Sequence, residues 1–253
     1  MPPVVSHMVA ARRVAESLEV PSIGLEFGSY LLGSTSPDVR VLTHWERERT
    51  HFFDLNNEDE HQDSVRGFFK AHDTLKNVSK LNEMTIAWVC GFITHLIMDE
   101  TYIVRIYRPR FGLRSALGGG SRANLLDRVL QYELDRRERE DQVGMRLLRD
   151  ALHASAVEMN AGFIDRRMLL EWRDITATMT ETAPDWRRFT YVASRHLRHV
   201  GIRTEDDFKK FLTELPEMLD QSIISETLDE IDGFYEEVHE RSVSEIKEYL
   251  GWH

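Results

Sequence analysis

Residues 84–98 form the longest uncharged stretch of the chain, and this stretch predicts a buried helix. Its sequence is MTIAWVCGFITHLIM, and Asp99 follows directly. His95 and Asp99 are four residues apart, so an α-helix would place them on one face, with Gly91 one turn earlier. This HxxxD spacing suits two ligands of one metal ion, because a buried carboxylate has to be paired with positive charge. The alternative is a core histidine hydrogen-bonded to a helix-end aspartate.

The remaining hydrophobic pattern is also helical. Positions 7, 11, 14 and 18 share one stripe, which places His7 on an otherwise apolar face, and Ser6 is positioned to cap this helix. After the break at residues 118–121, amphipathic helices follow, the first from about residue 124 to 155. The charged run 135–141 is expected to be solvated. Pro and Gly are sparse and β-type alternation is rare, so the sequence predicts an all-α protein.

Two more candidate ligands precede the buried helix. A short helical run ends in small residues, and Pro37 fixes the backbone immediately before Asp38. His51 lies in the segment RTHFFD, whose aromatic residues indicate a partly buried imidazole. Five imidazole or carboxylate groups thus occupy buried or fixed positions, a pattern that favours a metal site over separate packing roles: His7, Asp38, His51, His95 and Asp99.

The order of these residues resembles the zinc-dependent phospholipase C family, which is similar in fold to the zinc single-strand-specific nucleases. The matching pieces are His7 on an early helix, a G-S-x-x-P-D turn ending at Asp38, Thr50-His51 before an aromatic pair, and G-F-x-x-H-x-x-x-D ending at Asp99. The resemblance covers about residues 1–105. It implies a multi-helix phospholipase C/nuclease-like bundle with zinc ions in a cleft, here with a C-terminal helical extension.

The resemblance also implies roles for single residues. Asp38, His51, His95 and Asp99 would surround one metal ion, and Asp99 would bridge to a second ion that His7 also binds. Asp38 would deprotonate or orient the attacking water. The expected cofactor is zinc, as one or two ions, although manganese, iron and nickel also accept these ligands.

Two parts of the family pattern are missing. Secreted members use an N-terminal tryptophan as a ligand, whereas the first tryptophan of this chain is Trp45. They also carry an H-x-x-x-E helix after the H-x-x-x-D helix, whereas the HxxxE found here, His44 to Glu48, comes earlier. The resemblance therefore implies one complete metal site, a partial second site and no third site.

Charge and composition limit the partners and the compartment. Residues 204–253 carry the whole net charge of −11, which argues against nucleic acid and makes these acidic helices a candidate surface for a protein partner. The N-terminus shows no secretory signal, no apolar run is long enough to span a membrane, and Cys90 is the single cysteine. We therefore expect a cytoplasmic protein with a metal-binding half at 1–117 and a helical half at 121–253.

An arginine-rich segment follows the HxxxD helix. Arg105, Arg108 and Arg110 alternate with aromatic residues, and guanidinium groups suit the oxygens of a substrate phosphate. The alternative is that these arginines pair with the acidic C-terminal helices.

The sequence thus predicts a metal-dependent, phospholipase C-like hydrolase that acts on a small phosphoester or a phospholipid headgroup. One alternative is an HD-type phosphohydrolase built on His72-Asp73, the one adjacent His-Asp pair. The other is a non-catalytic helical interaction protein with a structural or relic metal site.

Overall fold

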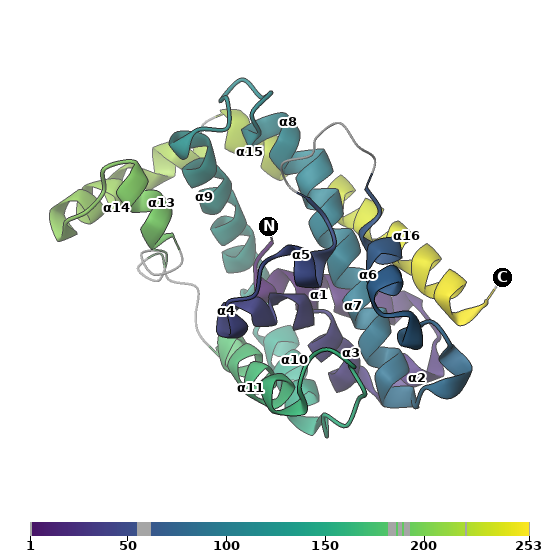
Figure 1. The fold of residues 1–253 in the computed structure, drawn as a ribbon. Helices are drawn as coiled ribbons and strands as arrows, with labels where there is room; N and C mark the ends of the chain where they lie inside the picture. Colours follow the sequence, from purple (N-terminus) through teal and green to yellow (C-terminus); the bar gives the residue numbers. More distant parts are fainter. Residues whose placement is uncertain are drawn as a thin grey trace.

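The computed structural model describes residues 2–54, 62–181, 186, 189, 193–220 and 222–252, and the regular elements in these ranges are helical, with no β-strand among them (Figure 1). The all-α prediction is confirmed. The α-helices are α1 (Val4–Ser17), α2 (Pro21–Leu25), α3 (Phe27–Gly33), α4 (Arg40–Thr43), α5 (Glu48–His51), α6 (Ser64–Ala71), α7 (Glu83–Tyr102), α8 (Arg108–Phe111), α9 (Ser121–Glu138), α10 (Gln142–Ala154), α11 (Arg166–Glu181), α13 (Ser194–His199), α14 (Glu205–Asp220), α15 (Ser222–Asp229) and α16 (Ile231–Leu250). Shorter turns are η1 (Ser36–Val39), η2 (Asp73–Leu75), η3 (Val78–Lys80) and the π-helix η4 (Ile103–Tyr107).

The buried helix predicted from the uncharged stretch is α7, and it forms the centre of the fold. Every residue from Thr85 to Tyr102 is buried. The helix begins where the Asn82 side chain accepts a hydrogen bond from the Thr85 amide at 2.8 Å, which satisfies one of the first free N–H groups. Helices α1, α2, α3 and α16 pack against it, so α7 contacts both the N-terminal and the C-terminal ends of the chain.

Two glycines let α3 and α7 cross with their backbones in contact. A Cβ atom on Gly33 would lie 2.0 Å from the Trp88 carbonyl oxygen, and one on Gly91 would lie 2.0 Å from the Tyr30 carbonyl oxygen. No side chain fits at either position, because a Cβ atom essentially never comes within 3.0 Å of another heavy atom. The crossing brings the residues after α3 against the second half of α7.

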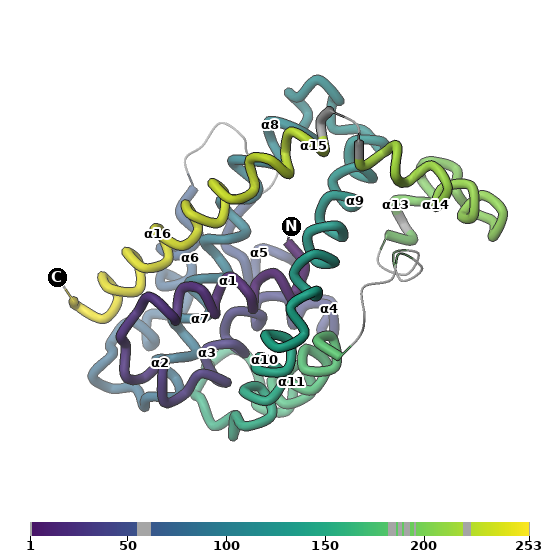
Figure 2. The backbone as a smooth tube through the Cα atoms, turned by 180° about the vertical axis from the view of Figure 1, so that it is seen from behind, coloured from purple at the N-terminus to yellow at the C-terminus, as the bar shows by residue number. Residues whose placement is uncertain are grey.

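The apolar side chains form two clusters that α16 connects. One joins the N-terminal helices to α10 and α11 and includes Ile246 near the end of α16. The other joins the end of α7 to α9 and the helices that follow, and includes Phe234 and Val238 from the first half of α16. Arg241 of α16 also donates hydrogen bonds to Glu100 at 2.6 Å and Thr101 at 2.7 Å. The C-terminal half therefore supports the central helix directly (Figure 2).

Three local predictions were wrong. The helix expected at residues 124–155 is two helices, because α9 ends at Glu138 and Asp141 caps α10 by accepting from the Gly144 amide at 2.8 Å. The charged run 135–141 is partly buried, with Asp135 and Arg139 paired at 2.7 Å. Ser6 lies inside α1, which begins after Pro3, and its hydroxyl donates to the carboxylate of Glu138.

Helices α13 and α14 lie away from the central bundle. In both views α13 and α14 lie on the far side of α9 from α7 (Figures 1 and 2). None of the described helices is both long enough and apolar enough to cross a lipid bilayer.

Candidate metal centre

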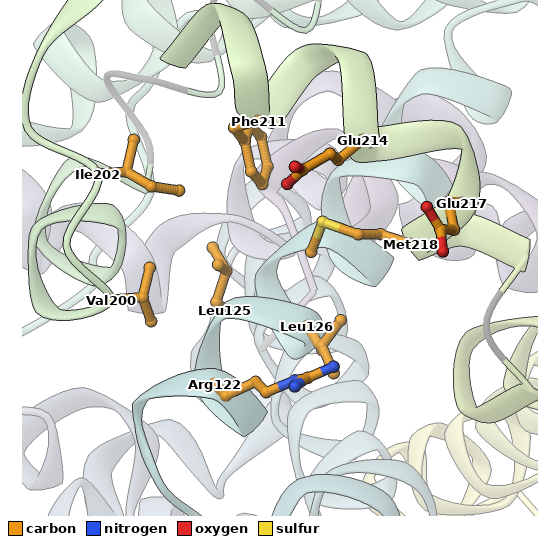
Figure 3. Close-up of a pocket in the computed structure, with 9 residues that line it drawn as sticks. All are labelled: Arg122, Leu125, Leu126, Val200, Ile202, Phe211, Glu214, Glu217 and Met218. Atoms are coloured by element: carbon orange, nitrogen blue, oxygen red, sulfur yellow. The ribbon is translucent and has the colours of Figure 1, made fainter. Parts of the chain in front are cut away.

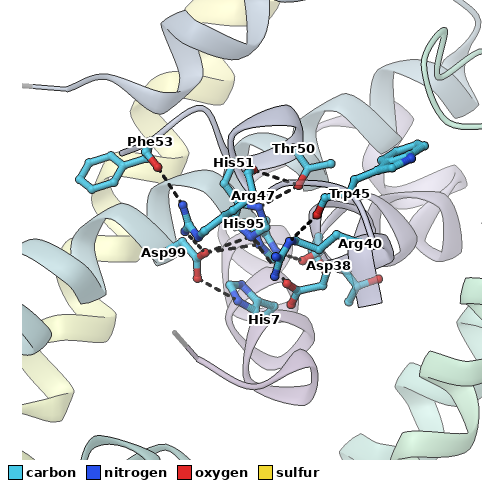
Figure 4. Close-up of polar contacts among 12 residues, drawn as sticks. His7, Asp38, Arg40, Trp45, Arg47, Thr50, His51, Phe53, His95 and Asp99 are labelled. Carbon is cyan, nitrogen blue, oxygen red and sulfur yellow. Dashed lines mark hydrogen bonds and ion pairs between the residues drawn. The ribbon is translucent and has the colours of Figure 1, made fainter. Parts of the chain in front are cut away.

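Five side chains from four elements converge beside the second half of α7 (Figure 4). His95 and Asp99 lie one turn apart on α7. His7 comes from α1, Asp38 from η1, and His51 is the last residue of α5. The structure therefore brings together all five residues that the sequence predicted as ligands. Asp38 is the most exposed of them, with 15% of its side chain accessible, and so lies on the solvent side of the cluster.

His95 is oriented by the backbone of the residue that follows α3. Its Nδ1 atom lies 2.8 Å from the carbonyl oxygen of Ser34. Because a carbonyl oxygen only accepts, Nδ1 carries the hydrogen and Nε2 presents its lone pair to the cluster. Hydrogen bonds of this kind are the usual way in which a protein fixes the orientation of a metal-binding histidine. The contact depends on the glycine crossing of α3 and α7, since a Cβ atom on Gly91 would lie 2.7 Å from the Ser34 nitrogen.

His51 lies close to ligand atoms of three other residues. Nε2 of His51 lies 3.4 Å from Nε2 of His95, 3.3 Å from Oδ2 of Asp99 and 3.6 Å from Oδ1 of Asp38. Nε2 of His95 lies 3.8 Å from Oδ2 of Asp99. Ligands at about 2.0–2.2 Å from a tetrahedral zinc ion are roughly 3.3–3.6 Å from one another, and the three distances from His51 lie in this range.

His7 extends this cluster to the other oxygen of Asp99. Its ring stacks on His95 with a centroid distance of 3.8 Å, and its Nε2 lies 3.4 Å from Oδ1 of Asp99. Both nitrogens of His7 and this oxygen are buried, and none of them has a hydrogen-bond partner in the part of the chain that the structure describes. Buried polar atoms without partners are uncommon in folded proteins, and a cation next to them satisfies them. The residues present therefore fit a divalent metal ion.

The charges in the cluster favour metal binding at neutral pH. Burial by itself would raise the pKa of Asp99, but the three histidines and Arg47 outweigh it and hold that pKa well below its usual range. Burial opposes a similar shift at Asp38, where the hydrogen bond from His51 and the nearby imidazoles lower the pKa to about 2. Burial and the adjacent His7 lower the pKa of His95 to about 3. Both carboxylates are thus ionised and His95 is neutral, as ligands must be.

Arg47 is a member of the cluster that the sequence reasoning missed. Its Nη2 donates to Oδ2 of Asp99 at 2.9 Å and its Nη1 to the carbonyl oxygen of Phe53 at 3.0 Å. Only 8% of the residue is exposed. The signal that could have revealed it is its position four residues before His51, whose amide donates to the Arg47 carbonyl at 2.9 Å. One helical turn therefore brings both side chains to Asp99.

Comparison with known families agrees with this geometry. Residues 6–101 match the sequence model of a family described as zinc dependent phospholipase C. This part of the chain is similar to the zinc-dependent phospholipase C family. All five converging residues and Arg47 lie inside the matched range. No curated protein and no solved structure matches the chain.

The arginines that were expected to hold phosphate lie just beyond the part matched by the zinc-dependent phospholipase C family. Arg105 is paired with Glu237 at 2.6 Å, and Arg110 with Glu230 at 2.6 Å and Glu226 at 3.2 Å. These partners belong to α15, α16 and the residue between them, as the alternative interpretation expected. Arg108 instead lies over the ring of Phe53, at 5.3 Å from its centroid, next to the backbone carbonyl that accepts from Arg47.

The residues of the alternative sites lie outside the cluster. His44 and Glu48, the early HxxxE pair, are both exposed. His72 stacks on Phe163 with a ring distance of 3.8 Å, and Asp73 is exposed. None of these four residues belongs to the two groups of potential metal ligands among the described residues, which are His7, His95 and Asp99, and Asp38, His51 and His95.

A separate pocket of about 460 Å³ lies between α9 and α14 (Figure 3). Leu125 and Leu126 of α9 face Phe211 and Met218 of α14 across it, with glutamates and one arginine among the other lining residues. Among the described residues that line it there is no histidine or cysteine, so it lacks the ligand types of the candidate metal centre. It also lies outside residues 6–101.

Proposed function

We propose that the chain is a zinc-dependent hydrolase of phosphoric esters, similar in activity to a phospholipase C. The observation that carries the proposal is the convergence of His51, His95, Asp99 and Asp38, in which Nε2 of His51 lies 3.3–3.6 Å from a ligand atom of each of the other three. The family match over residues 6–101 supports the same chemistry. The expected substrates are small phosphodiesters and phospholipid headgroups.

Different residues of the site would bind the metal and orient its ligands. His51, His95, Asp99 and Asp38 would hold one zinc ion. His7 and Oδ1 of Asp99 would be a position for a second ion. The chemistry that bound zinc supplies is a lowered pKa of water and a polarised phosphoryl oxygen. The Ser34 carbonyl keeps Nε2 of His95 directed at the centre.

Asp38 is the residue best placed to act on the attacking water. It is the one member of the cluster with appreciable solvent access, so a water molecule entering the site meets its carboxylate. Its carboxylate would deprotonate or orient that water.

The test is hydrolysis of bis(4-nitrophenyl) phosphate and 4-nitrophenyl phosphorylcholine by the zinc-loaded protein. We expect turnover that a chelator abolishes, and a decrease of about 10²- to 10⁴-fold in Asp38→Asn, the range that a positioned acid-base group contributes. His72→Ala is the matched control, because it removes the histidine of the HD-type alternative, and its rate should equal that of the wild type. Absence of turnover on all phosphoesters tried would favour the helical interaction protein with a structural metal.

A further inference from the structure

The guanidinium of Arg47 is a permanent cation inside the metal cluster. It lies 2.9 Å from Oδ2 of Asp99, the same oxygen that faces Nε2 of His51 and Nε2 of His95. Arg47 comes from the turn that carries His51, and the carbonyl of Phe53 holds its other end at 3.0 Å. Hydrogen bonds thus hold both Nη atoms of the guanidinium, and Arg47 is buried from solvent.

The positive charge of Arg47 limits the number of divalent ions that the site can hold. Carboxylates bind metal in their ionised form and histidines in their neutral form, so in a metal-bound site Asp38 and Asp99 contribute −1 each and the histidines contribute no charge. Asp38, Asp99 and Arg47 together carry a net charge of −1, so one divalent ion brings these groups to +1 and two ions would bring them to +3. Excess charge in a buried site is strongly unfavourable, and a charge of +1 still attracts an anionic phosphoester.

The number of ligand atoms also limits the site to one tightly bound ion. The two groups of three potential ligands share His95. Because the Ser34 carbonyl engages Nδ1, His95 has only Nε2 to offer and can serve one ion. If that ion lies with Asp38 and His51, the other group keeps only His7 and Oδ1 of Asp99. Two protein ligands are fewer than the three that zinc sites in proteins ordinarily provide.

We infer that Arg47 takes the place of a second metal ion, so that the chain binds one ion tightly, at Asp38, His51, His95 and Asp99. This inference rests on the proposed function. Arg47 acts as a positioning residue: it neutralises part of the Asp99 charge and holds that carboxylate toward the ion. His7 and Oδ1 of Asp99 are then left as a second, weak position for a cation, so His7 is not required for the tight ion.

The experiment titrates the full chain with zinc and measures binding by calorimetry. Elemental analysis counts the bound metal. The wild type should bind one tight ion. Arg47→Met leaves the cluster more negative, so a second ion should bind at least about tenfold more tightly than it does to the wild type. Arg47→Lys should restore the wild-type behaviour, because it restores the positive charge. Arg139→Met is the control, because Arg139 is an equally buried arginine that is paired with Asp135 on α9.

The outcomes separate this inference from the proposed function. Two tight ions in the wild type, or equal affinity for the second ion in wild type and Arg47→Met, would overturn the inference while leaving a metal-dependent hydrolase intact. Absence of any tight ion in the wild type would overturn both. If Arg47→Met does not fold, His7→Ala decides: retention of the single ion supports the inference, and loss of that ion overturns it.

Discussion

Nδ1 of His95 donates a hydrogen bond to the carbonyl oxygen of Ser34 over 2.8 Å, and this contact links the metal cluster to the helix crossing beneath it. The crossing exists because Gly33 and Gly91 leave no side chain between α3 and α7. The fold and the orientation of the central ligand thus depend on the same two glycines.

The first prediction concerns Gly91→Ala. The added methyl would lie 2.0 Å from the carbonyl oxygen of Tyr30 and would push α3 away from α7. Overpacking of this kind costs about 1–3 kcal/mol, and movement of Ser34 should also weaken metal binding. Urea unfolding and a zinc titration measure both effects. Gly24→Ala is the matched control, because nothing lies within 4 Å of its added carbon, and it should unfold at the wild-type urea concentration or above it. Equal stability of Gly91→Ala and the wild type would contradict the account of the crossing.

The second prediction is that metal stabilises the fold. The ligands come from α1, η1, α5 and α7, so an ion in the cluster ties four separate elements together. At a free metal concentration about 1,000-fold above Kd, binding adds about 4 kcal/mol, which corresponds to a Tm increase on the order of 10 °C for a chain of this size. Thermal unfolding with zinc and with a chelator measures the difference. Identical melting curves in the two conditions would count against a site built across these elements.

The third prediction concerns the pH dependence of stability. Glu138 accepts hydrogen bonds from the hydroxyls of Ser6 and Tyr235, and burial raises its pKa from 4.5 to about 7. The folded state therefore binds this proton more tightly than the unfolded state, so the stabilisation is full below about pH 4.5 and is lost as pH rises through 7. Relative to Glu138→Gln, the wild type should lose on the order of 1–3 kcal/mol between pH 5 and pH 8.

The measurement is urea unfolding of the metal-free proteins at several pH values. His95 acts in the opposite direction, because its lowered pKa makes stability rise with pH between about 3 and 6.5, but it is present in both proteins and cancels in their difference. Glu140→Gln changes an exposed carboxylate two residues away and serves as the control. A difference between wild type and Glu138→Gln that stays constant with pH would show that this carboxyl titrates normally.

The fourth prediction separates the three arginines after α7. Arg105 and Arg110 are paired with glutamates on the surface, so Arg105→Ala and Arg110→Ala should leave KM unchanged and cost at most about 1 kcal/mol of stability. Arg108 lies over the ring of Phe53, whose carbonyl oxygen accepts from Arg47, so Arg108→Ala should raise KM severalfold for a phosphodiester. Steady-state kinetics with bis(4-nitrophenyl) phosphate makes the comparison. The same KM for all three variants would place every one of these arginines outside substrate binding.

The sequence revealed those features that depend on local spacing. The HxxxD pair of α7 could be predicted because four residues make about one helical turn, and Asp38 because Pro37 restricts the backbone before it. The break between α9 and α10 was missed, because the apolar stripe continues across it and only the cap at Asp141 marks it.

The contacts that support the site could not be predicted from the sequence, for a different reason. Ser34 acts through its backbone carbonyl, which every residue has, so its identity carries no signal. Arg47 lies among charged neighbours in the segment ERERTH, and only the tertiary fold turns this arginine inward to Asp99 while Glu46 and Glu48 stay exposed. Glu138 likewise gains its altered pKa from α1 and α16, which are distant in sequence.

The central claim is that the five converging residues form a metal centre, and elemental analysis of protein purified without added metal tests it most directly. Wild type and His95→Ala should be compared side by side, because His95 belongs to both groups of potential ligands. We predict about one zinc ion per chain in the wild type and almost none in His95→Ala. A wild-type chain without metal, or a His95→Ala chain that retains the full amount, would contradict the claim.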